Sequence, residues 1–256
     1  MNQFFEQIKV SLRPVVYSFR TIRRLLLSCI YPSKITNAKQ IPIIINNRNR
    51  FEYLLQLINS LENRGYNNIF IIDNDSTYPP LLEYYKTCKY EIFMLGENVG
   101  HLAMWDTYVH KRFIKDYYVY TDSDVVPIEE CPIDFMNFFW ETLKQKPKVQ
   151  KIGFSLKIDD LPDSFKNKNE VIEWEKQFYQ NKVKDHFYEA LIDTTFALYR
   201  PFMQAGKGGL MYRTVAPYEA RHMPWYVDSE NLSHEEKYYI NNATTSTHWT
   251  KFNSDK

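Results

Sequence analysis

The stretch Ile41–Leu61, IPIIINNRNRFEYLLQLINSL, decides the fold. It opens with a short run of β-branched residues, which predicts a buried strand. Apolar residues then recur at helical spacing, and Gly65 follows the last of them, which predicts a helix and its end. The helical positions are Phe51, Leu54, Leu55, Ile58 and Leu61. A strand that leads into a helix is the unit from which α/β sheets are built.

The same alternation continues to the middle of the chain. Further apolar runs are Asn68–Asp73, Tyr90–Leu95 and Tyr117–Thr121, and Pro80–Cys88 is a short helical segment opened by proline. We expect one more helix, whose apolar face consists of Leu102, Trp105, Val109 and Phe113. Strands that are apolar along their whole length predict an α/β fold with a central, mostly parallel, Rossmann-like sheet and helices on both faces.

The second half of the chain is less regular. Asp134–Lys146 is predicted to be a helix with Asp134 as its N-cap, and Lys151–Ile158 and Thr195–Arg200 are predicted strands. Between these strands, residues 159–189 are polar and rich in tyrosine, which suits either an excursion around a ligand site or a solvated helical surface. We expect an N-terminal segment, 1–38, and a single domain, 39–256, with halves 39–130 and 131–256.

Composition excludes several classes of protein. The chain has 256 residues and a net charge of +1, which implies no general attraction to nucleic acid. Its cysteines, Cys29, Cys88 and Cys131, are odd in number and far apart, which favours a reducing compartment over a disulfide framework. No apolar run approaches the roughly 20 residues of a membrane span. We therefore expect a cytoplasmic protein, either soluble or bound peripherally at the inner face of the cell membrane.

The N-terminal segment differs from the rest in its charge. Residues 1–35 carry six basic side chains and one acid, Glu6, and apolar residues recur at helical spacing among them. This pattern predicts a basic amphipathic helix. Such a helix either lies on an anionic membrane surface or packs on the domain and presents its arginines to water. The sequence leaves both interpretations open.

Polar residues follow each of the four predicted parallel strands. They are Asn46–Arg50, Asp73–Thr77, Gly96–His101 and Asp122–Asp124. The carboxyl ends of parallel strands meet at one edge of a sheet, where ligands bind. Two carboxylates in an extended turn, Asp122 and Asp124, suit a hard divalent cation that takes its other ligands from phosphate and water. Such a cation neutralises the charge that develops on a leaving nucleoside diphosphate.

These motifs, in this order and at these separations, resemble the family 2 glycosyltransferases of the GT-A fold. They are IPIIINNRNR…LLQLINSL, IIDNDST, GENVGHLAMWD and YVYTDSDVVP, over roughly residues 41–130. The resemblance implies a nucleotide-sugar donor, usually a UDP-sugar, a divalent metal (Mn²⁺ or Mg²⁺) and inversion at the anomeric carbon. The chain departs from the family pattern at Asn74, where a second acid is frequent, and at His101.

The resemblance also implies roles for residues at the strand ends. Asp73 contacts the nucleobase, Asn98 and Gly100 shape the donor loop, Asp122 faces the ribose or sugar, and Asp124 is a metal ligand. The remaining donor-binding candidates of the strand ends are Asn46, Asn47, Arg48, Asp75, His101 and Ser123.

The second half must supply a general base, because an inverting transfer needs one to deprotonate the acceptor hydroxyl. Asp193 and Glu219 are the candidates, with Asp193 preferred because it precedes a predicted strand. The pair Glu235–Glu236 is a poorer candidate, since it is expected to begin an exposed, capped helix.

The cluster Arg221–Tyr226 offers three further contacts. Arg221 is a candidate for the diphosphate, His222 for a third metal ligand, and Trp225 for stacking on a sugar face. Each also has a purely structural interpretation, as an exposed arginine, a core histidine and a core tryptophan. His248 is an alternative to His222 as the metal ligand.

The sequence therefore predicts a metal-dependent glycosyltransferase that acts on a saccharide or lipid-linked saccharide acceptor in surface polysaccharide synthesis, with membrane contact through residues 1–35. Two alternatives remain: a sugar nucleotidyltransferase, and a non-catalytic nucleotide- or carbohydrate-binding module on the same fold.

Overall fold

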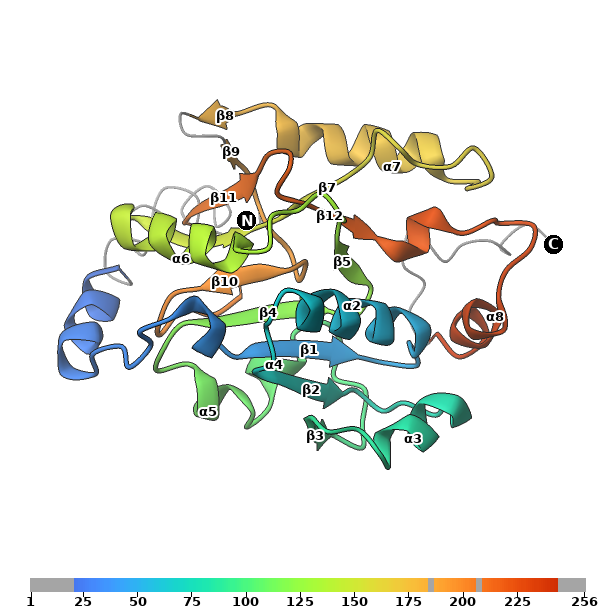
Figure 1. The fold of residues 1–256 in the computed structure, drawn as a ribbon, viewed down its shortest axis with the longest axis horizontal. Helices are drawn as coiled ribbons and strands as arrows, with labels where there is room; N and C mark the ends of the chain where they lie inside the picture. Colours follow the sequence, from blue (N-terminus) through green and yellow to red (C-terminus); the bar gives the residue numbers. More distant parts are fainter. Residues whose placement is uncertain (1–20, 184–186, 206–208, 244–256) are drawn as a thin grey trace, which may run out of the picture.

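The computed structural model describes residues 21–183, 187–205 and 209–243. Within these residues nine strands form a central sheet in the order β3-β2-β1-β4-β10-β6-β11-β9-β8 (Figure 1). Their bounds are β1 Ile43–Asn47, β2 Ile69–Asp73, β3 Glu91–Met94, β4 Tyr118–Asp122, β6 Val149–Gly153, β8 Lys182–Val183, β9 Phe187–Glu189, β10 Ala197–Tyr199 and β11 Leu210–Thr214. Three strands form a smaller sheet: β5 Val125–Pro127, β7 Ser155–Leu156 and β12 Glu219–His222. The predicted α/β class is confirmed.

The first half of the chain forms the parallel part of the sheet. β1 lies between β2 and β4, and β2 also pairs with β3, all in parallel. In this register Asn47 lies opposite Asp73, and Asn46 lies opposite Asp122. Three of the four polar strand ends therefore lie side by side at one edge of the sheet. We call this edge, with Asn46, Asn47, Asp73 and Asp122, the donor rim.

Helices cover both faces of the parallel strands, as the apolar strands predict. Ile43 and Ile45 point to the face covered by α2 (Glu52–Asn63) and α6 (Phe135–Gln145). Ile44 points to the opposite face, towards α4 (Ala103–Asp106) and α5 (His110–Phe113). Side chains of one strand alternate between faces, so a strand that is buried on both must be apolar throughout.

The single helix expected from Leu102 to Phe113 is wrong, because the structure contains α4 and α5 instead. Thr107 ends α4 in an extended conformation, with φ −121° and ψ −176°, and its hydroxyl donates to the carbonyl oxygen of Ala103. This local bond competes with continuation of the helix, a known tendency of threonine.

The second half adds antiparallel strands. β10 pairs with β4 on one side and with β6 on the other, both antiparallel, whereas β6 and β11 are parallel. In the smaller sheet β12 pairs with β5, so that His222 lies opposite Val125. This pairing brings a late segment of the chain beside the turn that carries Asp124.

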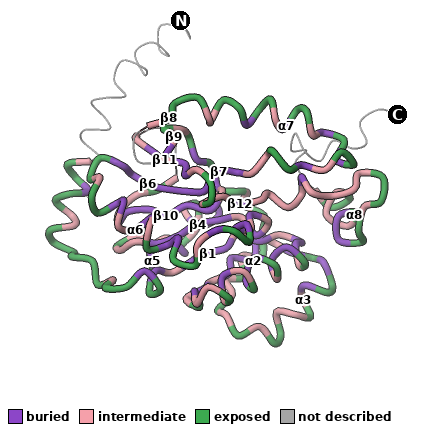
Figure 2. Tube along the Cα trace, turned by 45° about the horizontal axis from the view of Figure 1, so that its top comes forward, coloured by how far each residue is buried: buried purple, intermediate pink, exposed green. Residues whose placement is uncertain are grey.

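The polar stretch 159–189 contains a helix that packs on the domain. α7 (Lys168–Glu175) buries Val171 and Glu175, and Glu175 pairs with Arg213 of β11 at 2.8 Å. Figure 2 shows buried residues concentrated in the central strands, whereas α7 carries mostly exposed and half-buried residues. The remaining elements are η1 Ala38–Gln40, α3 Pro79–Tyr85, η2 Lys176–Tyr179, η3 Met223–Tyr226 and α8 His234–Asn241.

Residues 21–30 are helical and lie at the amino ends of the strands (Figure 1). The guanidinium of Arg24 is buried and donates to the carbonyl oxygen of Pro147 at 3.0 Å, while Ile22, Leu26 and Ile30 are exposed. The helix therefore does not pack on the domain by this apolar face, and Arg24 is directed towards the domain whereas Arg23 is exposed. Among the described helices, none combines the length and hydropathy that a membrane span requires.

Candidate active site

Asp122 closes β4 at the donor rim and is held by Asn46 of β1 and by Thr194 of the loop that precedes β10. Its Oδ2 accepts a hydrogen bond from Thr194 Oγ1 at 2.5 Å, and its backbone N–H donates to the carbonyl oxygen of Thr194 at 3.1 Å. The amide of Asn46, opposite it on β1, is a further partner. Burial, and next the nearby charges of Asp124 and Asp193, raise the pKa of Asp122 well above its usual value. A bound cation would stabilise the ionised form.

Asp124 lies two residues beyond Asp122 and faces His222. Its backbone carbonyl accepts from the N–H of Met223 at 2.8 Å, which fixes the start of η3 against the turn. His222 Nε2 lies 3.6 Å from Asp124 Oδ1, and both side chains are less than one-fifth exposed. Burial lowers the pKa of His222, while the charge of the facing Asp124 acts in the opposite direction. A neutral imidazole is the form that binds metal.

Buried oxygen atoms that accept no hydrogen bond are concentrated at the donor rim. Within the described residues, four oxygens at these strand ends are buried and accept no hydrogen bond: Asn46 Oδ1, Asn47 Oδ1, Asp73 Oδ2 and Asp124 Oδ1. Buried polar atoms of this kind are rare in proteins and are usually satisfied by a ligand, an ion or water. A cation or a donor of hydrogen bonds would satisfy these oxygens. Arg48 Nε and Asn49 Nδ2, unpaired nitrogens just after β1, would be satisfied by an acceptor such as a phosphate.

These residues fit a divalent cation bound in part by the protein. Two ligands of one hard ion at about 2.1 Å lie roughly 3 Å apart, close to the separation of Asp124 and His222. In the described part of the chain, no three His, Cys, Asp or Glu side chains converge into a complete metal centre. A pair of protein ligands, with phosphate oxygens and water in the other positions, is the arrangement that Mg²⁺ commonly adopts beside a bound nucleotide. His248, the competing ligand, lies outside the described residues.

The end of β2 is shaped by the side chains of Asp73 and Asn74. Asp73 is buried, and its Oδ1 accepts from the N–H of Ser76 at 3.0 Å. Asn74 accepts from the N–H of Val99 and donates to the carbonyl oxygen of Gly100, both at 2.8 Å. A carboxylate could accept the first bond but could not donate the second. This explains the departure from the family pattern at Asn74: an amide is needed to hold the third loop.

The other candidates of the strand ends are placed around this core. Asn47 donates to the hydroxyl of Tyr85, Arg48 donates to the carbonyl oxygen of Asn242, and Ser123 is buried beside the carbonyl oxygen of Asn46. Asn98 accepts from the N–H of Gly100, whose φ of +83° favours glycine, and His101 is exposed. Asp75, also with a left-handed φ of +67°, is half-buried.

The structure brings Asp193, but not Glu219, to the donor rim. Asp193 is exposed and precedes Thr194, which binds Asp122. Glu219 lies on β12 among Lys157, Asp159 and Asp160, and burial raises its pKa. Because side chains alternate along a strand, Glu219 and His222 point to opposite faces of β12.

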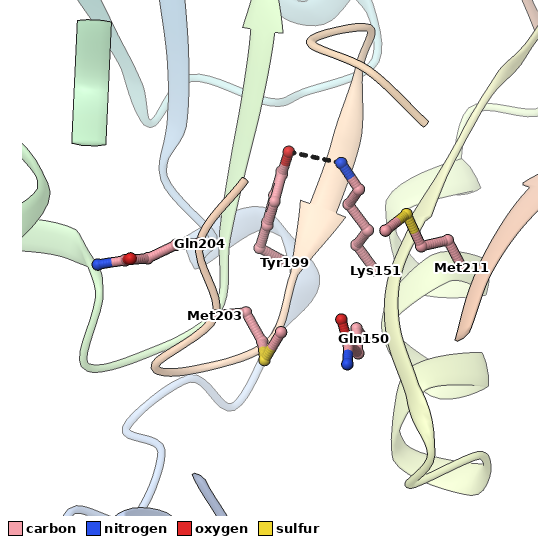
Figure 3. A pocket seen from close by; sticks show the side chains of 6 residues that line it. All are labelled: Gln150, Lys151, Tyr199, Met203, Gln204 and Met211. Carbon is pink, nitrogen blue, oxygen red and sulfur yellow. Dashed lines mark hydrogen bonds between the residues drawn. The ribbon is translucent and has the colours of Figure 1, made fainter. Parts of the chain in front are cut away.

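Lys151 holds the segment that carries Asp193 from behind. Its ammonium group is buried in β6 and donates to the carbonyl oxygen of Ile192 at 2.7 Å and to the hydroxyl of Tyr199 at 2.9 Å. Burial lowers the pKa of Lys151 to about 7. Figure 3 shows its side chain directed at Tyr199 from a small pocket that Met203 and Met211 also line.

Arg221 and Trp225 are not placed as we expected. The guanidinium of Arg221 pairs with Asp160 at 2.5 Å and lies over the ring of Tyr226, away from the carboxylates of the donor rim. Trp225 is 3% exposed and belongs to the main apolar core, with its ring 4.6 Å from that of His222. A buried ring has no free face for a sugar, so Trp225 supports His222 and does not form a stacking surface in this structure.

The expectation that Glu235 and Glu236 lie exposed is wrong. Both are buried at the start of α8, which Ser233 caps as the sequence predicts. Glu235 accepts from the backbone N–H groups of Phe51 and Glu52 at 2.7 Å and so caps the N-terminus of α2. Two free N–H groups and the helix dipole both favour a carboxylate at this position.

Glu236 forms a buried ion pair with Arg50, a residue that the sequence analysis missed. Their closest atoms are 2.7 Å apart, and the hydroxyl of Tyr53 also donates to Glu236. The guanidinium of Arg50 lies 3.5 Å from the centre of the Tyr239 ring. Asp124 and Asp122 both act on the pKa of Tyr239, which burial raises. α8 therefore forms one wall of the donor rim, and the only sequence signal for it was the place of Arg50 among the polar residues that follow β1.

Neither a protein-family model nor a curated protein sequence matches the chain. Among solved structures, one similar chain is the glucosyl-3-phosphoglycerate synthase of Mycobacterium tuberculosis in complex with Mn²⁺ and UDP-glucose. The TM-score is 0.39 and the sequence identity 11%, over 63% of this chain and 56% of the synthase. The chain thus spans little more than half the length of that protein. We base no functional conclusion on a similarity of this level.

Proposed function

We propose that the protein is a metal-dependent glycosyltransferase that moves a sugar from a nucleotide-sugar donor, a UDP-sugar by preference, to a hydroxyl group of a glycan. The observation that carries the proposal is the donor rim. There the buried, unsatisfied oxygen of Asp124 faces the buried imidazole of His222, beside two further unsatisfied oxygens of Asn46 and Asn47. These groups provide a place for a cation and a donor with hydrogen-bonding groups.

Each residue has a role that follows from its position. Asp124 and His222 would hold a divalent cation, Mn²⁺ or Mg²⁺, and Asp122 would lie beside it, orientated by Thr194. The cation would neutralise charge on the leaving diphosphate. Asp73, at the end of the neighbouring strand, would contact the nucleobase, and Asn74 fixes the loop on the far side.

Asp193 is the proposed general base. Its exposed carboxylate would take the proton of the acceptor hydroxyl as that oxygen bonds to the anomeric carbon and the bond from this carbon to the diphosphate breaks. Attack from the side opposite the leaving group inverts the anomeric configuration. NMR of the product anomer tests this step, since retention would exclude Asp193 from that role.

The proposal as a whole is tested with Asp124→Ala. We expect release of UDP from a panel of UDP-sugars with Mn²⁺ to fall by at least about a hundredfold, the loss typical of removing one electrostatic stabiliser of a transition state. Asp163→Ala is the matched control, because the Asp163 side chain is 98% exposed and distant from the rim in sequence and structure. Unchanged turnover by Asp124→Ala would exclude the mechanism.

Two outcomes would assign the protein to another class. A wild-type protein that binds UDP with Mn²⁺ but turns over no sugar nucleotide would be a binding module. Formation of pyrophosphate from UTP and a sugar 1-phosphate would identify a nucleotidyltransferase.

We propose surface polysaccharide synthesis at the cytoplasmic face of the membrane as the setting, on the strength of the basic N-terminal segment.

A further inference from the structure

The helix at residues 21–30 presents an apolar face to solvent. Of the ten large apolar side chains exposed in the described chain, five lie between Ile22 and Tyr31, so exposure of this kind is concentrated here. Ile22, Leu25, Leu26 and Ile30 are 46–67% exposed and follow the spacing of one helical face. Cys29 is exposed on the same face. Contiguous apolar surface of this kind marks an interaction site.

The opposite side of this helix is fixed to the domain. Arg24 is buried and donates to the carbonyl oxygen of Pro147. Just beyond the helix, the ring of Tyr31 packs 5.9 Å from that of Phe202, and Ser33 donates to Asp116 at 2.6 Å. The apolar face therefore does not turn inwards in this structure, and its exposure is a property of how the helix is attached.

Charge identifies the occupant. Exposed basic groups flank the face: Arg23 on the helix, Lys34 after it, and Lys115, whose ammonium lies 5.3 Å from the ring of Tyr31. Across residues 1–35 the sequence holds six basic side chains and one acid. An apolar strip bordered by cationic groups matches an anionic lipid surface, where the strip enters the acyl boundary and the cations meet the headgroups.

Size argues against a second copy of the chain. At roughly half exposure, the four large aliphatic side chains of this face present on the order of 300 Å² of accessible surface. A stable dimer needs about 800 Å² from each partner. We propose that the face formed by Ile22, Leu25, Leu26, Cys29 and Ile30 docks the protein on an anionic bilayer, with Arg24 holding the helix to the domain.

Vesicle flotation of the full chain tests the proposal. The wild type should float with phosphatidylcholine vesicles that contain phosphatidylglycerol, less with phosphatidylcholine alone, and less as salt rises. The double variant Leu26→Glu/Ile30→Glu should bind at least roughly tenfold more weakly, since two half-exposed apolar side chains are lost from the contact. Ile133→Glu is the matched control, because Ile133 is 63% exposed elsewhere and should bind like the wild type.

A fluorophore on Cys29 distinguishes the possible occupants. In a Cys88→Ser variant, its emission should shift to shorter wavelength only when anionic vesicles are added. A shift already present without lipid would mean that the chain itself covers the face. A dimer in light scattering that the double variant abolishes would make a second copy the occupant. Either result, or flotation equal to wild type by the double variant, would overturn the proposal.

Discussion

The burial of Lys151 predicts how the stability of the fold depends on pH, and this prediction requires no assumption about ligands. It lies in a central strand, 3% exposed, and in the structure it donates to the carbonyl oxygen of Ile192 and the hydroxyl of Tyr199. Burial without a carboxylate in contact lowers its pKa to about 7, and Arg213 acts in the same direction, against the opposite effect of Asp193. In the unfolded chain the same ammonium group has the unperturbed pKa of a lysine, about 10.4.

The sign of the effect on stability follows from proton counting. Between about pH 7 and pH 10 the unfolded chain binds one proton more than the folded chain, so raising the pH stabilises the fold by up to about 1.4 kcal/mol per unit. Below about pH 7 the group is charged in both states and the full penalty of burying its charge is present. Integrated from about pH 6 to pH 9, the contribution of Lys151 is an increase of about 2.5 kcal/mol in the unfolding free energy.

Urea denaturation of the wild type and of Lys151→Met at these pH values measures the effect. The difference between the two unfolding free energies should move by about 2.5 kcal/mol in favour of the wild type as the pH rises. The hydrogen bonds that the variant loses contribute a constant offset, so only the slope matters. Lys111→Met, at an exposed lysine, should follow the wild type at every pH. Parallel curves for wild type and Lys151→Met would refute the reasoning.

Three further predictions concern the donor rim. Glu236→Gln should lower the unfolding free energy by about 3–5 kcal/mol in urea, because it leaves the Arg50 charge buried and unpaired. Thr194→Val should weaken Mn²⁺ binding by about tenfold in calorimetry, because loss of the hydroxyl donor raises the pKa of Asp122 further. Asn74→Asp should cost about 1–3 kcal/mol of stability at neutral pH, because a carboxylate cannot donate to the loop carbonyl that it would then face.

Each of these has its own control. Glu230→Gln, at an exposed position, should change stability by less than about 0.5 kcal/mol, and an equal loss in both glutamate variants would contradict the ion pair. Thr194→Ser retains the hydroxyl and should keep the Mn²⁺ affinity; affinity unchanged in Thr194→Val would mean that this bond does not tune the ligand. Restored stability of Asn74→Asp at acid pH, where the carboxyl can donate, is the expected companion result.

The elements of the parallel half were predictable because their signals are local. A strand buried on both faces, such as Ile43–Asn47, must be apolar at every position, and α2 shows helical spacing whatever its partners are. That the polar ends of β1, β2 and β4 meet at one edge followed from the parallel order of the strands, whereas the register that places Asp122 opposite Asn46 did not. The break at Thr107 was missed, because apolar spacing is the same for one helix and for two that are nearly in phase.

The residues missed at the site depend on contacts between distant segments. The sequence around Glu236 does not indicate that it is buried, because its partner Arg50 lies far away in the sequence, near the start of the domain. Glu235 and Glu236 follow Ser233 in the pattern of a capped helix start. This pattern correctly predicted α8, but the prediction that both side chains are exposed was wrong. The burial of Lys151 was not predictable for the same reason: its partners are backbone carbonyls, which leave no trace in a sequence, and the hydroxyl of Tyr199 on another strand.

The attachment of the N-terminal helix bears on the length of the acceptor. Ser33 binds Asp116, just before β4, whereas Asp122 closes the other end of that strand. Six residues of extended chain span about 20 Å. A bilayer in contact with helix 21–30 would therefore lie on the order of 20 Å from the reacting carbon. A sugar attached directly to a lipid carrier would fall short of Asp193, and a growing chain that projects into water would reach it. Such an enzyme would choose among acceptors by reach as well as by chemistry.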